Sequence, residues 1–105
     1  MKGARIAAGT WGGSISWEVD PKQGDLTAYG LQAVSLNGPG GSRGVVAAVT
    51  FNATTRIVTY TFGRGDLDTP GEYTLVADLV HGTAPALDRL VRTTTQFSVY
   101  PASRR

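Results

Sequence analysis

The sequence predicts an all-β domain, built as an antiparallel β-sandwich of about seven strands. Apolar and polar residues alternate along most of the chain, as half-buried strands require. The composition of 14 Gly and 5 Pro in 105 residues, with abundant Val and Thr, favours strands joined by tight turns over helices. Turn residues recur roughly every 8 to 12 positions, which is the spacing typical of sandwich strands.

The first third of the chain predicts three strands. Residues 5–10 form an irregular first strand, and in residues 14–20 three apolar side chains, Ile15, Trp17 and Val19, alternate with polar ones. Residues 20–25 are a cluster of turn formers. Along residues 26–36 the apolar positions change from one face to the other, and a bulge near Gly30 would explain the change.

The middle of the chain predicts a loop followed by a hairpin. Residues 37–44 carry four glycines and a proline, so we expect an exposed loop there, because glycine is too mobile and proline lacks a ladder donor. Alternation resumes over residues 45–51 and again over residues 57–62. The intervening residues 52–56 form a turn, which makes the two runs a hairpin.

The last third predicts two long strands. A polar connection over residues 63–71 leads into a strand at residues 72–80, and a loop over residues 81–89 precedes the final strand at residues 90–100. The length fits one domain. We divide it into an N-terminal arm or first edge strand (residues 1–13), the sandwich (residues 14–101) and a basic C-terminal tail (residues 102–105).

Composition removes several classes of function. The absence of cysteine excludes disulfides, thiolate metal sites and a cysteine nucleophile. A net charge of +2, spread along the chain, is no footprint for specific nucleic-acid binding. The N-terminus lacks the apolar region of a signal peptide, and no apolar run approaches the length of a membrane span, so we expect a soluble protein that is not secreted.

The segment around residues 66–73 resembles the corner before the sixth strand of immunoglobulin-like domains, in which a tyrosine packs into the core and bonds back to the chain. Tyr73 is the candidate tyrosine, and Pro70 and Gly71 permit the tight turn. An aspartate upstream, with Asp68 the residue chosen, would satisfy turn donors. This corner makes the predicted sandwich immunoglobulin-like.

Several segments together resemble the N-terminal immunoglobulin-like domain of phage baseplate upper proteins: Asp25-Leu26-Thr27-Ala28-Tyr29, Val58-Thr59-Tyr60-Thr61-Phe62, the single residue Asp66, and the corner Asp68-Thr69-Pro70-Gly71-Glu72-Tyr73. The resemblance covers roughly residues 14–100. It implies a structural virion protein of a tailed phage, assembled in the host cytoplasm. Baseplate proteins continue into a long C-terminal region, whereas this sequence ends at Arg105, so a capsid decoration protein, a neck or tail accessory and a small adaptor stand beside the baseplate role.

We expect such a protein to act through contacts with other virion subunits of the capsid, neck or tail, as a homo-oligomer or symmetric array. Trp11 would be an anchor on a glycine-rich arm, because buried aromatics dominate interface energies; folding back onto its own sandwich is the alternative. The candidate contact residues are Trp11, Gly12, Gly13, Asn37, Gly38, Pro39, Gly40 and Arg43.

We expect no enzyme activity, cofactor or metal. His81, the single histidine, precedes Gly82 in an expected turn, and the aspartates match no calcium-binding loop, so turn and cap roles are favoured for them. The main rival function is a carbohydrate- or cell-surface-binding module. Its candidate stacking residues are Trp11, Tyr29, Tyr60 and Tyr100.

Overall fold

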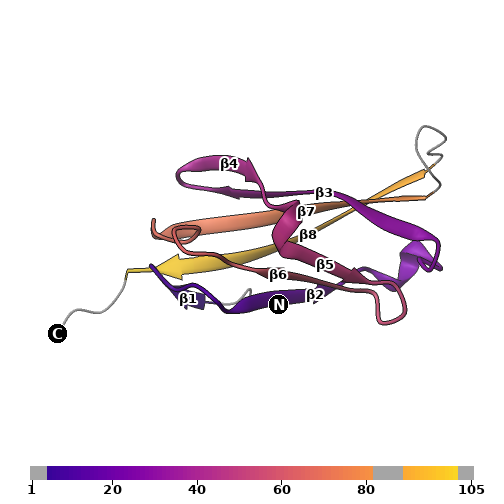
Figure 1. The fold of residues 1–105 in the computed structure, drawn as a ribbon, viewed down its shortest axis with the longest axis horizontal. Helices are drawn as coiled ribbons and strands as arrows, with labels where there is room; N and C mark the ends of the chain where they lie inside the picture. Colours follow the sequence, from indigo (N-terminus) through magenta and orange to yellow (C-terminus); the bar gives the residue numbers. More distant parts are fainter. Residues whose placement is uncertain (1–4, 82–88, 102–105) are drawn as a thin grey trace.

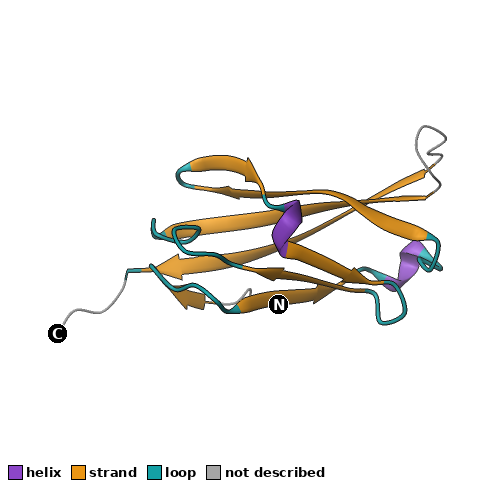
Figure 2. Cartoon of the chain, viewed as in Figure 1, coloured by secondary structure: helices purple, strands orange, loops and turns teal. Residues whose placement is uncertain are grey.

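Two β-sheets pack face to face in the computed structural model, which describes residues 5–81 and 89–101 (Figures 1 and 2). The described residues form eight strands and two single-turn 3₁₀ helices. The elements are β1 (Arg5–Ala7), β2 (Ser14–Glu18), η1 (Pro21–Gln23), β3 (Tyr29–Gly38), β4 (Gly41–Gly44), η2 (Val46–Ala48), β5 (Val49–Asn52), β6 (Ile57–Thr61), β7 (Gly71–His81) and β8 (Arg89–Tyr100). The prediction of an all-β sandwich is confirmed.

The strand order places β1-β8-β7-β3-β4 in one sheet and β2-β6-β5 in the other. The prediction of a wholly antiparallel sandwich is wrong at one place, because β1 pairs with β8 in parallel. β1 is an edge strand of its sheet, and no hairpin joins it to β8. No tight turn therefore forces these two strands to be antiparallel. The orders β2-β6-β5 and β8-β7-β3-β4 equal the orders B-E-D and G-F-C-C′ of immunoglobulin-like sandwiches.

The core lies between the two sheets. The largest fully buried side chains are Tyr60, Phe97, Leu26, Leu67, Leu75, Leu79, Val19 and Val58. Those that lie in strands, namely Val58, Tyr60, Leu75, Leu79 and Phe97, are on the inward face of alternating positions, as the sequence predicts, whereas Val19, Leu26 and Leu67 enter the core from the connections. Trp17 packs against this core and donates its indole N–H to Thr93 Oγ1 at 3.0 Å, a bond that joins β2 to β8 across the two sheets. The predicted core placement of Trp17 therefore holds, with a polar anchor for its indole.

A bulge on β3 produces the change of apolar face. The register against β7 shifts between Leu31 and Ala33, so Gln32 is the extra residue. Before it Tyr29 is buried, and after it the buried positions are Val34 and Leu36. The predicted irregularity near Gly30 thus exists and lies two residues further on.

The glycine-rich segment is not the loop that its composition predicts. It forms a hairpin, in which β3 continues to Gly38, Pro39 and Gly40 make the turn, and β4 pairs back from Gly41. Pro39 lies in the turn, where no backbone N–H is needed for strand pairing. β4 is an edge strand, so it pairs on one side only. Glycine content alone therefore overstated the disorder of this segment.

The strand predicted over residues 45–51 begins only at Val49. Residues Val46–Ala48 form the 3₁₀ turn η2, closed by a bond of 2.9 Å from Ala48 N to Val45 O. Here the chain crosses from β4 in one sheet to β5 in the other, which an extended strand could not do. The predicted hairpin is confirmed as β5 and β6, and both long C-terminal strands lie where expected.

Parts of the predicted arm, loop and tail lie outside the described residues, namely 1–4, 82–88 and 102–105. His81 is the last residue of β7 and not part of a turn, and its ring lies 5.3 Å from that of Tyr29. In the part of the chain that the structure describes, no helix is long and apolar enough to cross a membrane.

Candidate functional site

Three segments that the sequence singles out meet at one end of the sandwich, on the left in Figure 1. They are the connection between β1 and β2, the β3–β4 hairpin, and residues 62–73, which lead from β6 into β7. Gly9 N donates to Leu67 O at 2.9 Å, and Gly12 N donates to Phe62 O at 2.8 Å. Arg43 of the hairpin pairs with Asp66. We call this region the corner end.

Tyr73 holds the corner at the start of β7. Its ring is buried and stacks on Phe97, with centroids 5.3 Å apart, while its hydroxyl donates to Thr69 O at 2.6 Å. This is the geometry that the resemblance to an immunoglobulin-like corner implies. Pro70 and Gly71 make the turn, and Gly71 has a positive φ of 144°.

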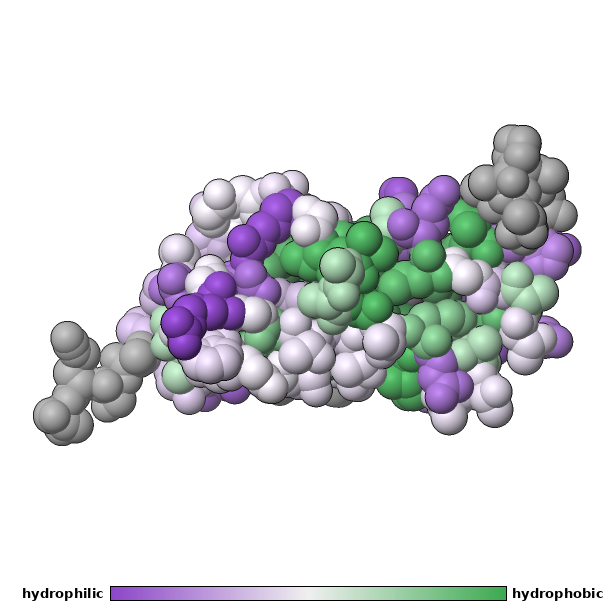
Figure 3. Space-filling model, viewed as in Figure 1, coloured by the Kyte–Doolittle hydropathy of each residue, from purple (hydrophilic) through white to green (hydrophobic). Residues whose placement is uncertain are grey.

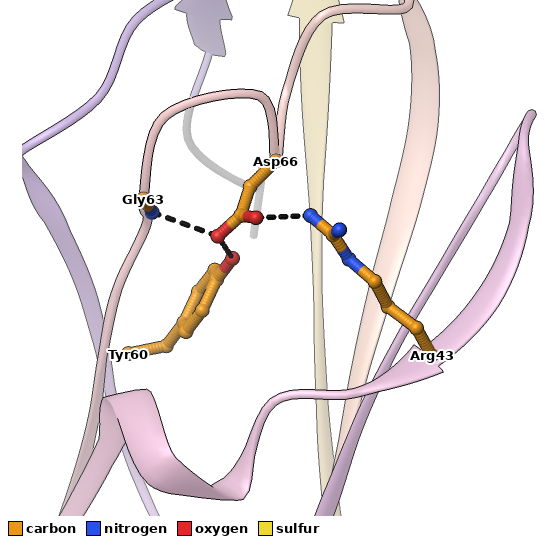
Figure 4. A network of polar contacts seen from close by, with 4 residues as sticks. All are labelled: Arg43, Tyr60, Gly63 and Asp66. Carbon is orange, nitrogen blue, oxygen red and sulfur yellow. Dashed lines mark hydrogen bonds and ion pairs between the residues drawn. The ribbon is translucent and has the colours of Figure 1, made fainter.

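Asp66, and not Asp68, is the aspartate that serves the corner. Its Oδ2 accepts from Tyr60 Oη at 2.6 Å and from Gly63 N at 2.7 Å, and its Oδ1 pairs with Arg43 (Figure 4). Asp68, by contrast, is exposed. Burial, reinforced by the bond to Asp66, raises the pKa of Tyr60 far above its usual range, so the hydroxyl stays a donor.

The glycine-rich arm is tethered at its described residues. Gly12 N donates to Phe62 O at 2.8 Å, and Phe62 N donates to Gly13 O at 3.0 Å. Gly13 lies under Phe62, where a Cβ would come within 3.0 Å of the ring. Trp11 itself points outward, 54% exposed, with the Arg64 guanidinium 4.7 Å from its ring centroid. Folding back, the alternative to the anchor role, therefore applies to the backbone of the arm, whereas the Trp11 indole is more than half exposed.

Most of the hairpin residues chosen as contacts serve internal packing. Asn37 Nδ2 donates to Thr74 O at 3.4 Å and to Ser35 Oγ at 3.2 Å. Gly38 lies against the Tyr73 ring, which an added Cβ at position 38 would overlap. Pro39 lies against Gly71, where an added Cβ would overlap the proline ring. Asn37 and Gly38 are half-buried, whereas Pro39, Gly40 and Arg43 are exposed, so the exposed part of the hairpin is its turn together with Arg43.

A shallow cleft of about 200 Å³ lies between the hairpin and residues 65–69. Its walls are mainly backbone and polar side chains, namely Leu36, Gly40, Gly41, Ser42, Arg43, Gly65, Asp66, Asp68, Thr69 and Tyr73. Arg43 and Asp66 neutralise each other within it, since they form an ion pair. The cleft can take a small polar group from a partner.

The predicted aromatic platform for a glycan is wrong in two of its four members. Tyr29 is 8% exposed and Tyr60 is fully buried, because both stand on the inward face of their strands. Trp11 and Tyr100 are the exposed pair, and each ring carries an arginine, Arg64 and Arg5 respectively. Two separate cation–π stacks therefore replace a flat stacking surface.

Three further aspartates have structural roles at turns and ladders. Asp20 Oδ1 accepts from Lys22 N at 2.9 Å, and Asp25 Oδ1 accepts from Thr27 N at 3.0 Å, which lowers the pKa of Asp25. Asp78 pairs with Arg92 across β7 and β8. Among the described residues, no group of three or more His, Asp or Glu side chains could hold a metal ion.

A broad apolar area lies over η2 and β5 on the face shown in Figure 3. Val46 is exposed, and Leu31, Val45, Ala48 and Phe51 are half-buried beside the core. Hydrophilic residues gather instead at the corner end of the same view. The two areas differ in chemistry, and the exposed indole belongs to the polar one.

Arg64 was not predicted from the sequence, and Asp66 was part of the resemblance but was not assigned as the corner aspartate. Nothing in the alternation marks Arg64, because it stands in a turn and acts through a residue 53 positions earlier, Trp11. Asp66 lies three residues after Gly63, and Asp66 N donates to Gly63 O at 3.1 Å, so its turn role carried a local signal that the choice of Asp68 overlooked. Comparison with models of known protein families, with curated proteins and with solved structures found no match.

Proposed function

We propose that this protein is a structural virion protein of a tailed bacteriophage, which joins other capsid, neck or tail subunits through its corner end. The resemblance to the N-terminal domain of baseplate upper proteins supports the choice of virion. The strand order of an immunoglobulin-like sandwich and the bond from Tyr73 to Thr69 agree with that resemblance. The role is a contact role, in which the sandwich is a scaffold.

The observation that carries this proposal is the gathering of an exposed tryptophan and two tethered loops at one end. Residues 9–13 and 62–67 are joined by backbone bonds, and Arg43 joins the hairpin to Asp66. Loops that are already ordered lose little entropy when a partner binds, so even a small contact area gives useful affinity. Repetition of that contact in a symmetric particle strengthens it further.

Mass spectrometry of purified virions of the phage that encodes this chain tests the proposal. We expect the protein to copurify with the particle at a fixed ratio to the major capsid or tail subunits. A second test adds the purified protein to particles that lack it and measures retention after sedimentation. Absence from the virion together with failure to bind such particles would contradict the proposal.

Carbohydrate binding remains a second candidate, and the exposure of Trp11 is the observation that favours it. Aromatic faces pack against sugar rings, but here the Arg64 guanidinium lies over the indole. Retention on a glycan array that is lost in Trp11→Ala, in a protein that does not enter virions, would favour this function over the first.

A further inference from the structure

Trp11 and Arg64 form an exposed stack that the fold itself does not need. Trp11 is more than half exposed, so burying its indole contributes little to the core. The stack stands beside the corner and not within it, since Tyr73, Asp66 and Leu67 make the internal contacts there. We propose that this stack is the anchor for a carboxylate-bearing segment of a partner protein, an inference that rests on the proposed function and names its partner chemistry.

The stack is preorganised on both sides. The segment that carries Trp11 is fixed by bonds from Gly9 N and Gly12 N to the opposite loop. The loop that carries Arg64 is fixed by Leu67, which is fully buried, and by Asp66, which accepts from Gly63 N. An aromatic and an arginine held in place are the residue types that dominate binding energy at protein interfaces.

The positive charge of Arg64 favours a negatively charged partner. In residues 5–81 and 89–101 the ion pairs join Arg43 to Asp66 and Arg92 to Asp78, and neither includes Arg64. Asp66, the carboxylate two residues away, directs its oxygens to Arg43, Tyr60 and Gly63. Asp68 lines the cleft on the hairpin side of the loop. The guanidinium therefore keeps an unmatched positive charge beside the indole.

The contact with Trp11 leaves N–H donors of Arg64 for a carboxylate of the partner. The guanidinium carbon of Arg64 lies over the indole, 4.7 Å from its centroid. A guanidinium carries five N–H donors in one plane, and a contact with a ring still allows these donors to meet a carboxylate. An apolar side chain next to that carboxylate would cover the exposed part of Trp11 and exclude water from the pair. The structure thus fits a partner segment in which Glu or Asp stands beside an apolar residue.

An NMR titration tests this inference with two short probes, acetyl-Glu-Leu-Glu-amide and acetyl-Gln-Leu-Gln-amide. We expect the acidic peptide to shift the Trp11 indole N–H and the Arg64 Nε–H, and the neutral peptide to leave both in place. Trp17 supplies an internal reference, because its indole is bonded to Thr93. Arg64→Gln should weaken binding by about tenfold, as expected for one lost charge-assisted hydrogen bond, and added salt should weaken it in the wild type.

Lys22→Gln is the matched control, since Lys22 is an exposed cation in η1, and it should bind the acidic peptide as the wild type does. Equal shifts from both peptides, or binding unchanged in Arg64→Gln, would overturn the inference. So would Trp11 shifts that follow protein concentration or added maltotriose without peptide, which indicate a second copy or a glycan. If the wild type enters virions while the peptides fail, only this inference falls; if it does not, the proposed function falls.

Discussion

The two ends of the sandwich both carry arginines, and they use them differently. At the far end Arg56 donates Nε to Val19 O at 3.4 Å and Nη2 to Asp20 O at 2.6 Å, and Nη1 to Gly24 O. At the corner end Arg43 is tied to Asp66, but Arg64 lies on an exposed indole and meets no carboxylate among the described residues. The far-end arginine closes two loops, whereas Arg64 adds nothing that the loops need.

This difference distinguishes side chains that stabilise the fold from side chains that are available for binding. A side chain that satisfies several backbone carbonyls is explained by the fold, since those carbonyls lose water when the loops pack. An exposed aromatic–cation pair on tethered backbone is not explained in this way, and interfaces favour this kind of pair. The changes below should therefore lower stability wherever they remove an internal partner, and lower association only at Trp11 and Arg64.

The largest effect should come from Asp66→Ala. This change leaves the fully buried Tyr60 hydroxyl and Gly63 N without their acceptor, which should cost about 3 kcal/mol of unfolding free energy. Chemical denaturation measures it. Asp68→Ala is the matched control and should change the midpoint little, because Asp68 is exposed. Equal losses from the two changes would contradict the assignment of Asp66 as the corner aspartate.

Gly38→Ala should come second. An added Cβ would overlap the Tyr73 ring, so either the hairpin or the corner must move, at about 2 kcal/mol of unfolding free energy. Gly40→Ala, two residues on in the turn, has no atom within 4 Å of its new Cβ and should be nearly neutral. Thermal unfolding of the two variants side by side measures the contrast. A neutral Gly38→Ala would mean that the hairpin does not pack on the corner.

Arg56→Gln tests the far end directly. It removes a charged donor from carbonyls of the connection between β2 and β3 and should cost about 1 kcal/mol of unfolding free energy without altering association. Arg64→Gln should do the reverse, because the contact of its guanidinium among the described residues is with an exposed ring. Denaturation and particle binding are measured on both variants. Loss of association in Arg56→Gln at full folding would break the contrast between the two ends.

The smallest effect near neutral pH is the pH dependence of stability that comes from the Tyr60 hydroxyl. Its pKa is higher in the folded chain than in the unfolded one, so its contribution to stability is complete below about pH 10, the ordinary tyrosine value. Stability should fall as the pH rises beyond that value, because the unfolded chain then releases a proton that the folded chain keeps. Alkaline denaturation curves of wild type and Tyr60→Phe test this, and parallel curves would contradict the buried bond.

The sandwich could be predicted because its signals are local. Alternation located β7 and β8 to within one residue at each end, and the change of face on β3 announced a bulge before any partner strand was known. The hairpin at Pro39 was missed because glycine content describes backbone freedom and not the pairing that restrains it.

The candidate site was predicted only in part, because its bonds join distant positions. Tyr73 and Trp11 were found from a corner motif and from a lone aromatic among glycines. The partners Arg43, Tyr60 and Asp66 come from three different segments, and no sequence spacing brings them together. The pairing of Trp11 with Arg64 likewise depends on how the arm lies on the loop.

Site-specific photocrosslinking in the virion tests the central claim, that the corner end is the docking end. The photoreactive residue p-benzoylphenylalanine replaces either Ser42, exposed at the corner end, or Thr54, exposed in the turn at the far end. Irradiated particles are then separated by mass. We expect Ser42→p-benzoylphenylalanine to give a crosslink to another virion subunit and Thr54→p-benzoylphenylalanine to give none. A crosslink from position 54 alone would contradict the account.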